Sequence, residues 1–436
     1  MKYNVFFGLI IFLLLLLNNI GKSQDNTNNP TSKLPSNPGP HIEKIKALGD
    51  NKWLELSAPR PDPTYGPSHG RSWSSRMAYA KDLGGAFIFG EGTHGVMYKD
   101  NFYADDLFFY DSNSNSWVCL YPGFDVTKYK DVKINDDGFE TINGAPTPIA
   151  SMVHGYAMTI YNSDTQSFMF MPCPGNYWDK IIGRRDVLGA GGEEFSPKIN
   201  NLHASPWIWD VKKGSWNRFK TKNKISKPLG FGAALVYIPS IKKIWVYSRS
   251  GTYYYNIATN DWETITPLGP KPPFGLEMNV CFDTKRQRVY LAGGDYPKAA
   301  KGTNAFWIYD IQSNTFVNPE PKGEPCNGET GYGTNDAIMN YDNANDVVVL
   351  FKTSKQGSGV YIYNPESNEW STALTASETL YFTKDNTRGS YSPFAIRSGF
   401  YDEHLNVHFV LGSTDTFFPE NKPYWEALVY RYKTTK

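Results

Sequence analysis

Short runs that alternate apolar with polar residues recur along the chain, and clusters of polar turn residues separate them. One ten-residue pattern repeats: aromatic, any residue, aromatic, Asp or Asn, five further residues, and then Trp or Phe. Alternation of this kind predicts β-strands, and an Asp or Asn side chain can accept hydrogen bonds from a turn backbone. Each copy is therefore expected to form a β-hairpin that its closing Trp or Phe covers. The copies begin at Phe108, Trp207, Tyr253, Trp307 and Tyr361.

A second predicted hairpin precedes each copy, as in residues 234–236 with 243–247, 280–282 with 288–291, and 338–341 with 347–351. Each unit then has four antiparallel strands, which is the make-up of one blade of a β-propeller. Six blades are counted, and a seventh stays open if a degenerate unit lies within residues 123–148 or 375–392. The first strands are expected to begin near Arg76, His154, Phe231, Glu277, Asn335 and Phe394.

The two ends of the repeat region complement each other. The last unit, which starts near Phe394, lacks its Trp-containing strand, and residues 51–56 (NKWLEL) match that missing strand. A ring closed in this way removes the exposed sheet edges that would otherwise promote aggregation. The sequence therefore predicts an all-β protein with a single propeller domain at residues 51–436, closed by an N-terminal strand that completes the last blade.

The N-terminus predicts export. Lys2 precedes an apolar run at residues 5–17, and small or polar residues follow it. This is the layout of a secretory signal, and the run is shorter than the roughly 20 residues of a spanning helix. We assign residues 1–24 to a signal peptide, with an uncleaved anchor as the alternative, and residues 25–50 to a flexible leader. The mature protein is expected to be secreted, either extracellular or periplasmic, with no membrane contact.

Composition narrows the functional classes. Lys and Arg number 44 against 43 Asp and Glu, which argues against a general nucleic-acid binder. Aromatic residues make up 15% of the chain, as expected for strand-rich proteins. None of the four cysteines has a zinc-type spacing, and we interpret most of them as small core residues while all three disulfide pairings stay open. These cysteines are Cys119, Cys173, Cys281 and Cys326.

Candidate chemistry gathers on one predicted face. Residues just before the first strands, and loops between second and third strands, meet there. The loops at residues 90–106 and 172–203 are long, and a loop of about 30 residues is uncommon unless it is functional or disordered. Of the chain's 7 histidines, His94, His154 and His203 fall on this face. Each can serve proton transfer, and the alternative for each is a structural imidazole bonded to a loop carbonyl.

Arg249 follows the second strand of the third unit, where its guanidinium can fork onto a carboxylate or sulfate. The alternative is an ordinary exposed arginine. Aromatic and basic residues in nearby loops can contact a sugar polymer by stacking and hydrogen bonding. These expected substrate-binding residues are Tyr177, Trp178, Arg184, Arg185, His203, Tyr254 and Tyr296, with Tyr156 near His154.

The repeat resembles the kelch-type propeller over residues 52–436, and the chain is partly similar to the propeller-fold ulvan lyases. That resemblance implies β-elimination on an acidic, sulfated, uronate-containing polysaccharide. An arginine neutralises the uronate carboxylate, which acidifies the C5 proton, and a histidine and a tyrosine act as base and acid. His154 and Arg249 match the family's His and Arg positions. At the tyrosine position stands Phe231-Gly232-Ala233.

A neighbouring tyrosine would have to substitute there, either Tyr156, Tyr177 or Tyr254, and His94 is a further catalytic candidate. The lyase family also has seven blades, against the six counted in this chain. The alternative function is a non-catalytic propeller that binds a glycan or another protein.

No nucleotide-binding or protease motif occurs. We expect no required cofactor and a monomeric protein. A structural zinc ion at the histidines or a calcium ion at loop carboxylates is compatible with the sequence, although solvated acidic loops are the simpler interpretation. The loop carboxylates are Asp105, Asp106, Glu193 and Glu194.

Overall fold

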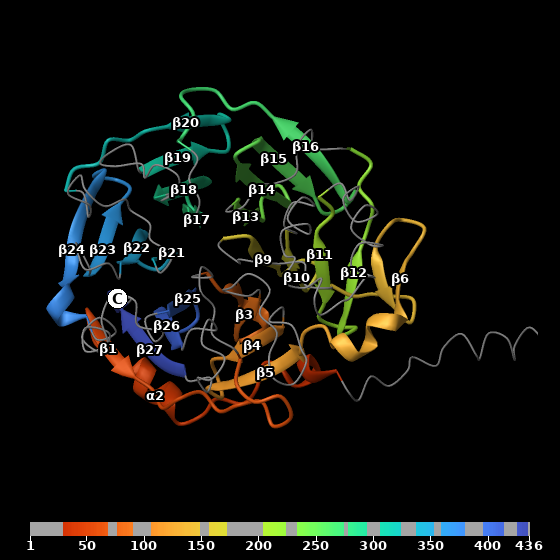
Figure 1. Cartoon of the computed structure of the whole chain (residues 1–436). Helices are drawn as coiled ribbons and strands as arrows, with labels where there is room; N and C mark the ends of the chain where they lie inside the picture. The colour runs from red at the N-terminus through yellow and green to blue at the C-terminus, as the bar shows by residue number, and fades with distance from the viewer. Residues whose placement is uncertain are drawn as a thin grey trace, which may run out of the picture.

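Six four-stranded antiparallel sheets are arranged around a common centre (Figure 1). The computed structural model describes residues 29–68, 76–89, 106–148, 157–171, 204–223, 233–273, 278–293, 306–323, 337–352, 359–379, 396–413 and 425–434. Each sheet is one blade of a propeller, as the sequence predicted. The strands of each blade follow chain order from the centre outwards, apart from the sixth blade, which takes its outermost strand from the N-terminus.

The first three blades use the strands between residues 78 and 265. Blade 1 consists of β2 (Ala78–Ala80), β3 (Gly85–Phe89), β4 (Leu107–Asp111) and β5 (Ser116–Tyr121). Blade 2 consists of β9 (Thr159–Asn162), β10 (Ser167–Phe170), β11 (Trp207–Asp210) and β12 (Ser215–Arg218). Blade 3 consists of β13 (Ala234–Ile238), β14 (Lys243–Ser248), β15 (Gly251–Asn256) and β16 (Asp261–Ile265).

The other three blades continue in the same direction around the ring. Blade 4 consists of β17 (Met278–Asp283), β18 (Arg288–Gly293), β19 (Phe306–Asp310) and β20 (Thr315–Val317). Blade 5 consists of β21 (Ile338–Asp342), β22 (Val347–Lys352), β23 (Gly359–Asn364) and β24 (Glu369–Thr375). Blade 6 consists of β25 (Ile396–Asp402), β26 (Val407–Ser413), β27 (Trp425–Arg431) and β1 (Lys52–Glu55). Short helical turns are η2 (Lys81–Leu83), η3 (Val126–Asp131) and η7 (Ala376–Glu378).

The first strands form a closed inner ring, because β2 contacts β9 and β25, and the remaining first strands contact their neighbours in sequence. The count of six blades is confirmed for the described residues. The region at residues 123–148 forms a separate three-stranded sheet instead of a seventh blade. This sheet consists of β6 (Val132–Ile134), β7 (Glu140–Ile142) and β8 (Ala145–Pro146), and β8 lies against β12 at the outside of blade 2 (Figure 1).

The repeated pattern folds as the sequence predicted. In blade 1, Asp111 accepts hydrogen bonds from the turn amides of Asn113 and Ser114, at 3.0 and 3.4 Å. The Tyr110 hydroxyl donates to Asn115 at 2.8 Å, and Asn115 adopts the left-handed conformation that favours Asn and Gly (φ 49°). The closing Trp117 packs edge-on against Tyr110, with 5.4 Å between ring centroids. The motif thus fixes both the turn and the packing of the hairpin.

A sixth copy of this arrangement joins the two ends of the chain. Strand β1 pairs with β27 and completes blade 6, which confirms the predicted closure. The Tyr430 hydroxyl donates to Asn51 at 2.6 Å, and Trp53 packs on Tyr430 with 5.0 Å between ring centroids. The hydroxyl–Asn bond and the aromatic pair of blades 1, 3, 4 and 5 are therefore present here, divided between segments far apart in sequence.

The described part of the predicted flexible leader, residues 29–50, is folded onto the propeller, which corrects that prediction. It contains η1 (Pro30–Lys33) and α2 (His41–Lys46). Ile42 and Ile45 are buried on one side of α2. The Asn29 amide donates to the Val211 carbonyl at 2.7 Å, and Arg431 donates to the Ile45 carbonyl at 2.9 Å. The two apolar residues, three positions apart, form the face that anchors α2 to the propeller. The polar composition of the surrounding segment gave no sign of this face.

Two of the four cysteines, Cys119 and Cys281, lie among the described residues, and both are buried. This agrees with their interpretation as small core residues, whereas Cys173 and Cys326 fall outside those residues. Within the ranges that the structure describes, no helix is both long and apolar enough to cross a membrane. The signal-peptide prediction for residues 1–24 also concerns residues that are not described.

Candidate functional site

Arg249 lies in the two-residue turn that joins β14 and β15, and its side chain is exposed. Ser250 shapes this turn, since its amide donates to the Ser248 hydroxyl oxygen at 3.3 Å and the two hydroxyl oxygens lie 2.9 Å apart. The turn stands at the end of the blade where the first strand begins. The guanidinium is therefore on the face where the sequence placed the candidate chemistry, with its donors open to solvent.

Tyr254, in contrast, takes part in the contact between blades 3 and 4. Its hydroxyl lies 3.3 Å from the Tyr309 hydroxyl, and the Lys243 amino nitrogen lies 5.6 Å from its ring centroid. Burial raises the pKa of the Tyr254 hydroxyl. Its place in strand β15, packed against another blade, differs from the loop position expected of a stacking platform or a proton donor.

The other predicted site residues lie outside the described residues, so the structure does not test whether they lie close together. They are His94, His154, Tyr156, Tyr177, Trp178, Arg184, Arg185, His203 and Tyr296. Ala233, the last residue of the segment that replaces the lyase tyrosine, is described and completely buried.

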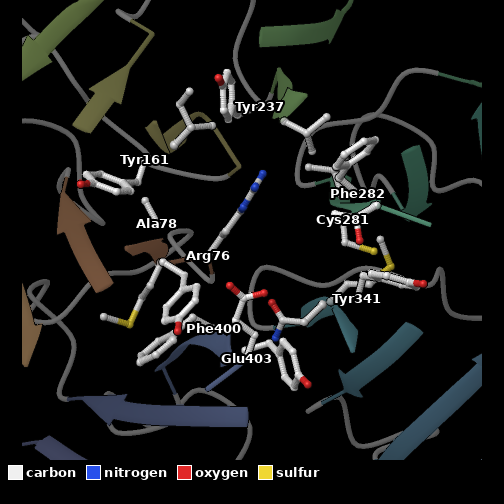
Figure 2. A pocket seen from close by; sticks show the side chains of 18 of the residues that line it. Arg76, Ala78, Tyr161, Tyr237, Cys281, Phe282, Tyr341, Phe400 and Glu403 are labelled. Carbon is white, nitrogen blue, oxygen red and sulfur yellow. The ribbon is translucent and has the colours of Figure 1, made fainter. Parts of the chain in front are cut away.

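A cavity of about 280 Å³ occupies the centre of the propeller, and residues from the first strands of all six blades line it (Figure 2). The lining also includes Pro239, Thr284, Asn343 and Glu403, which lie in the turns that follow first strands. The cavity therefore extends towards the face opposite the Arg249 turn. Because successive residues of a strand point to opposite sides, each first strand turns only alternate side chains towards this centre.

A belt of aromatic residues surrounds the cavity, with Phe282 in blade 4 and a tyrosine in each other blade: Tyr79, Tyr161, Tyr237, Tyr341 and Tyr401. Three of these hydroxyls donate to a carboxylate of the neighbouring blade, namely Tyr79 to Asp402 (3.1 Å), Tyr161 to Asp82 (2.9 Å) and Tyr237 to Asp164 (2.7 Å). Burial raises the pKa of all three hydroxyls. The belt thus links blades through its hydroxyls and leaves mainly ring surface to line the cavity.

Arg76 is the cation of this cavity. It lies just before β2, pairs through its backbone with Gly399 of β25, and extends its side chain across the middle of the cavity (Figure 2). The guanidinium donates to the Leu235 carbonyl, and it has no salt bridge with any described carboxylate. Burial lowers the pKa of Arg76 to about 10, so the side chain remains charged at neutral pH.

The other charged group lining the cavity is already compensated. The Glu403 carboxylate accepts from Lys81 at 2.6 Å and from Asn343 at 2.7 Å. The nearby Cys281 thiol stays protonated at neutral pH, because burial raises its pKa well above the usual range. As far as the described residues go, the cavity therefore presents one uncompensated positive charge among aromatic and aliphatic surfaces.

Sequence reasoning did not single out Arg76 as a functional candidate. A signal was present, because Arg76 precedes a first strand, and a residue at that position is expected to point towards the propeller axis. Arg76 becomes a candidate because no described carboxylate pairs with it. The sequence alone does not show which carboxylates reach a given arginine. No group of three His, Cys, Asp or Glu suited to a metal ion occurs in the described ranges.

Comparisons with known proteins give similarities to solved structures only. No family model matches the chain, and no curated protein matches it. The extracellular domain of BT4673 from B. thetaiotaomicron is 11% identical, with a TM-score of 0.39, and the match covers 86% of this chain but only 39% of that one. YjhT is 12% identical, with a TM-score of 0.40, and coverage is 72% of this chain and 85% of YjhT. A GH74 xyloglucanase from Xanthomonas campestris is 11% identical, with a TM-score of 0.42, and coverage is 86% and 55%.

Proposed function

We propose that this protein is an exported, monomeric propeller that binds acidic, uronate-containing polysaccharides on the face that carries Arg249. The observation that supports this proposal is the exposed guanidinium in the turn between β14 and β15. An arginine can form two parallel hydrogen bonds with a carboxylate or a sulfate ester, so it suits the repeating acidic groups of such a polymer. Binding of this kind requires no metal ion or cofactor.

Polysaccharide cleavage by β-elimination is the reaction proposed for this face. Arg249 would neutralise the uronate carboxylate and so acidify the adjacent C–H bond. The base would take the C5 proton, the C4–O bond would break, and an acid would protonate the leaving oxygen. His154, His94 and Tyr156 are the candidates for these proton transfers, with the other predicted loop residues as substrate contacts.

Binding without cleavage is the second candidate, and two placements favour it. Tyr254 is held between blades, and Ala233 occupies the end of the segment where the lyases have their tyrosine. Neither residue can supply an acid at the Arg249 turn. A polymer would then be retained by the guanidinium and nearby side chains without chemical change.

Ultraviolet absorbance separates the two candidates, because β-elimination creates an unsaturated uronate that absorbs and binding creates no product. The purified protein is incubated with a panel of uronic polysaccharides that includes ulvan. We expect Arg249→Ala to reduce turnover at least about tenfold, since one charge-assisted contact is lost in the transition state. The matched control is Arg60→Ala, which removes an exposed arginine remote from this turn.

Affinity gels with the same polysaccharides test binding independently. Retardation that Arg249→Ala weakens, together with flat absorbance, would support the binding propeller and exclude the lyase. Full turnover or full retardation in Arg249→Ala would show that the site assignment is wrong. Absence of both retardation and product across the panel would reject the polysaccharide proposal.

A further inference from the structure

We infer that the central cavity is a binding site for a small organic carboxylate, which Arg76 holds through its guanidinium. The inference concerns the central cavity instead of the exposed Arg249 turn, and it does not depend on the polysaccharide proposal. It rests on a cation with no carboxylate partner among the described residues, on neighbouring amide donors without partners, and on the volume and lining of the cavity.

The first support is the charge balance. A guanidinium has five N–H donors, and for Arg76 a single acceptor, the Leu235 carbonyl, is found among the described residues. Glu403, the acidic residue that lines the same cavity, is paired with Lys81. Placing a charge in a poorly solvated space is costly unless it is paired, so a cavity of this kind favours an anionic occupant.

The second support is a small compartment of about 10 Å³ that adjoins the main cavity and shares Arg76 and Asn340 with it. Asn279 also lines this compartment and is buried, with 6% of the residue exposed. The side-chain nitrogens of both Asn279 and Asn340 are buried and have no hydrogen-bond partner. Buried polar atoms are nearly always partnered, so these two amide donors beside Arg76 indicate a missing acceptor.

The cavity's shape and surface select the ligand class. Its volume of about 280 Å³ lies near the lower end of the range found for small-molecule pockets. The lining includes Phe282, Phe400 and aliphatic residues such as Val236 beside the single uncompensated cation. One positive charge suits a monoanion, and an arginine fork suits a carboxylate, while the aromatic belt suits a ring or apolar body. A monocarboxylate carrying one ring meets these requirements.

Isothermal titration calorimetry with benzoate tests the site, with benzamide as the uncharged ligand of the same shape. We expect benzoate to bind the full chain, benzamide to bind at least about tenfold more weakly, and Arg76→Gln to lose at least about tenfold in benzoate affinity. Arg60→Gln, which removes an exposed arginine, is the matched control and should bind as the unsubstituted protein does. If Arg76→Gln does not fold, Arg76→Lys replaces it, with a smaller expected loss because the charge is kept.

Crystals grown with 4-bromobenzoate locate the ligand without any substitution. An anomalous bromine peak in the central cavity, with the carboxylate at Arg76, would support the inference. A peak elsewhere, equal affinity for benzoate and benzamide, or unchanged benzoate affinity in Arg76→Gln would overturn it. Sodium chloride is titrated separately, and binding of chloride without binding of benzoate would replace the carboxylate site with one for an inorganic anion.

Discussion

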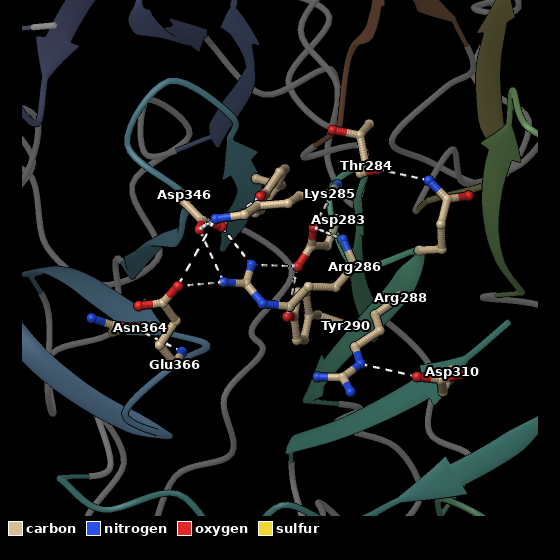
Figure 3. A network of polar contacts seen from close by, with 12 residues as sticks. Asp283, Thr284, Lys285, Arg286, Arg288, Tyr290, Asp310, Asp346, Asn364 and Glu366 are labelled. Atoms are coloured by element: carbon tan, nitrogen blue, oxygen red, sulfur yellow. Dashed lines mark hydrogen bonds and ion pairs between the residues drawn. The ribbon is translucent and has the colours of Figure 1, made fainter. Parts of the chain in front are cut away.

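Two arginines of the described structure, Arg286 and Arg76, differ in how their charge is balanced. Arg286, in the turn between β17 and β18, donates to Asp283, Asp346 and Glu366 at the contact between blades 4 and 5 (Figure 3). Hydrogen bonding to Asp346 raises the pKa of Arg286 and lowers the pKa of Asp346. Arg76 has no such carboxylate in the described part of the chain. Among the described residues, acidic side chains thus surround the guanidinium that joins blades 4 and 5, and none pairs with the guanidinium that faces the cavity.

This difference indicates a structural role for Arg286 and a ligand-binding role for Arg76. The carboxylates around Arg286 come from blades 4 and 5, so their attraction to the guanidinium holds the two neighbouring sheets together (Figure 3). A ligand has no free charge to recognise at that contact. Arg76 keeps N–H donors available for a ligand. Its burial in the cavity makes the free energy of binding an anion more favourable. The predictions that follow test whether substitutions lower the free energy of unfolding where an arginine is paired and leave it unchanged or higher where an arginine has no described carboxylate partner.

The largest expected effect concerns Arg218, the most deeply buried arginine of an ion pair in the described structure. Its guanidinium lies 3.3 Å from Glu140, and the two side chains are 3% and 1% exposed. We expect Glu140→Ala to lower the free energy of unfolding by about 3–5 kcal/mol, because it leaves a buried charge without its partner. Urea denaturation measures the loss, and the double variant Glu140→Leu with Arg218→Met should recover a large part of it. A loss below about 1 kcal/mol for Glu140→Ala would contradict the strength assigned to paired arginines.

Asp346→Asn is the second prediction, aimed at the Arg286 network. It weakens hydrogen bonds to Arg286, Lys285 and Tyr341, and we expect it to lower the free energy of unfolding by about 1–3 kcal/mol at neutral pH. Because folding depresses the pKa of Asp346, its contribution is present above the unfolded value of about 4 and is lost as the pH falls towards the folded value. Urea unfolding at neutral pH and below pH 4 should therefore show the gap between the two proteins narrowing in acid. A gap that is constant across this range would exclude the ionised pair as its cause.

Tyr161→Phe is the third prediction and tests the aromatic belt. The substitution removes the hydroxyl that donates to Asp82 at 2.9 Å, and we expect a loss of about 1 kcal/mol in unfolding free energy. The matched change is Phe282→Tyr, which adds a hydroxyl to the belt residue of blade 4. The neighbouring blade 3 has Ser240 at the turn position where blades 1 and 2 have Asp82 and Asp164, so the new hydroxyl meets no carboxylate at that position. It should not stabilise the protein, and thermal unfolding of both variants provides the comparison. Stabilisation by Phe282→Tyr would show that the belt needs no matched carboxylate.

The sequence predicted the fold well because its signals are local. The aromatic–Asp–Trp pattern specifies each hairpin through contacts within ten residues, as Tyr110, Asp111 and Trp117 show. Closure by residues 52–55 could be predicted because Trp53 repeats the same pattern. The anchoring of α2 was missed, since its polar flanks dominate its composition and only Ile42 and Ile45 reveal a buried side.

The candidate site was less predictable because it depends on contacts between distant blades. The position of Arg249 in a turn follows from local pattern, and the exposed side chain agrees with it. That Tyr254 would meet Tyr309 required knowing how blades 3 and 4 pack. The importance of Arg76 depends on which carboxylates reach it from other blades, and pairings across more than a hundred residues leave no local pattern.

Arg76→Met is the smallest expected change in stability and the one with the most informative sign. Removing a charge that has no described carboxylate partner should leave the unfolding free energy within about 1 kcal/mol of the original value, or raise it, in buffer without added carboxylates. Benzoate should then raise the melting temperature of the unsubstituted protein but not that of Arg76→Met, because a ligand that binds only the folded state stabilises it by mass action. Differential scanning calorimetry with and without benzoate measures both effects. A loss of stability as large as that of Asp346→Asn would mean that the bond to the Leu235 carbonyl makes Arg76 structural, and the contrast between the two arginines would fail.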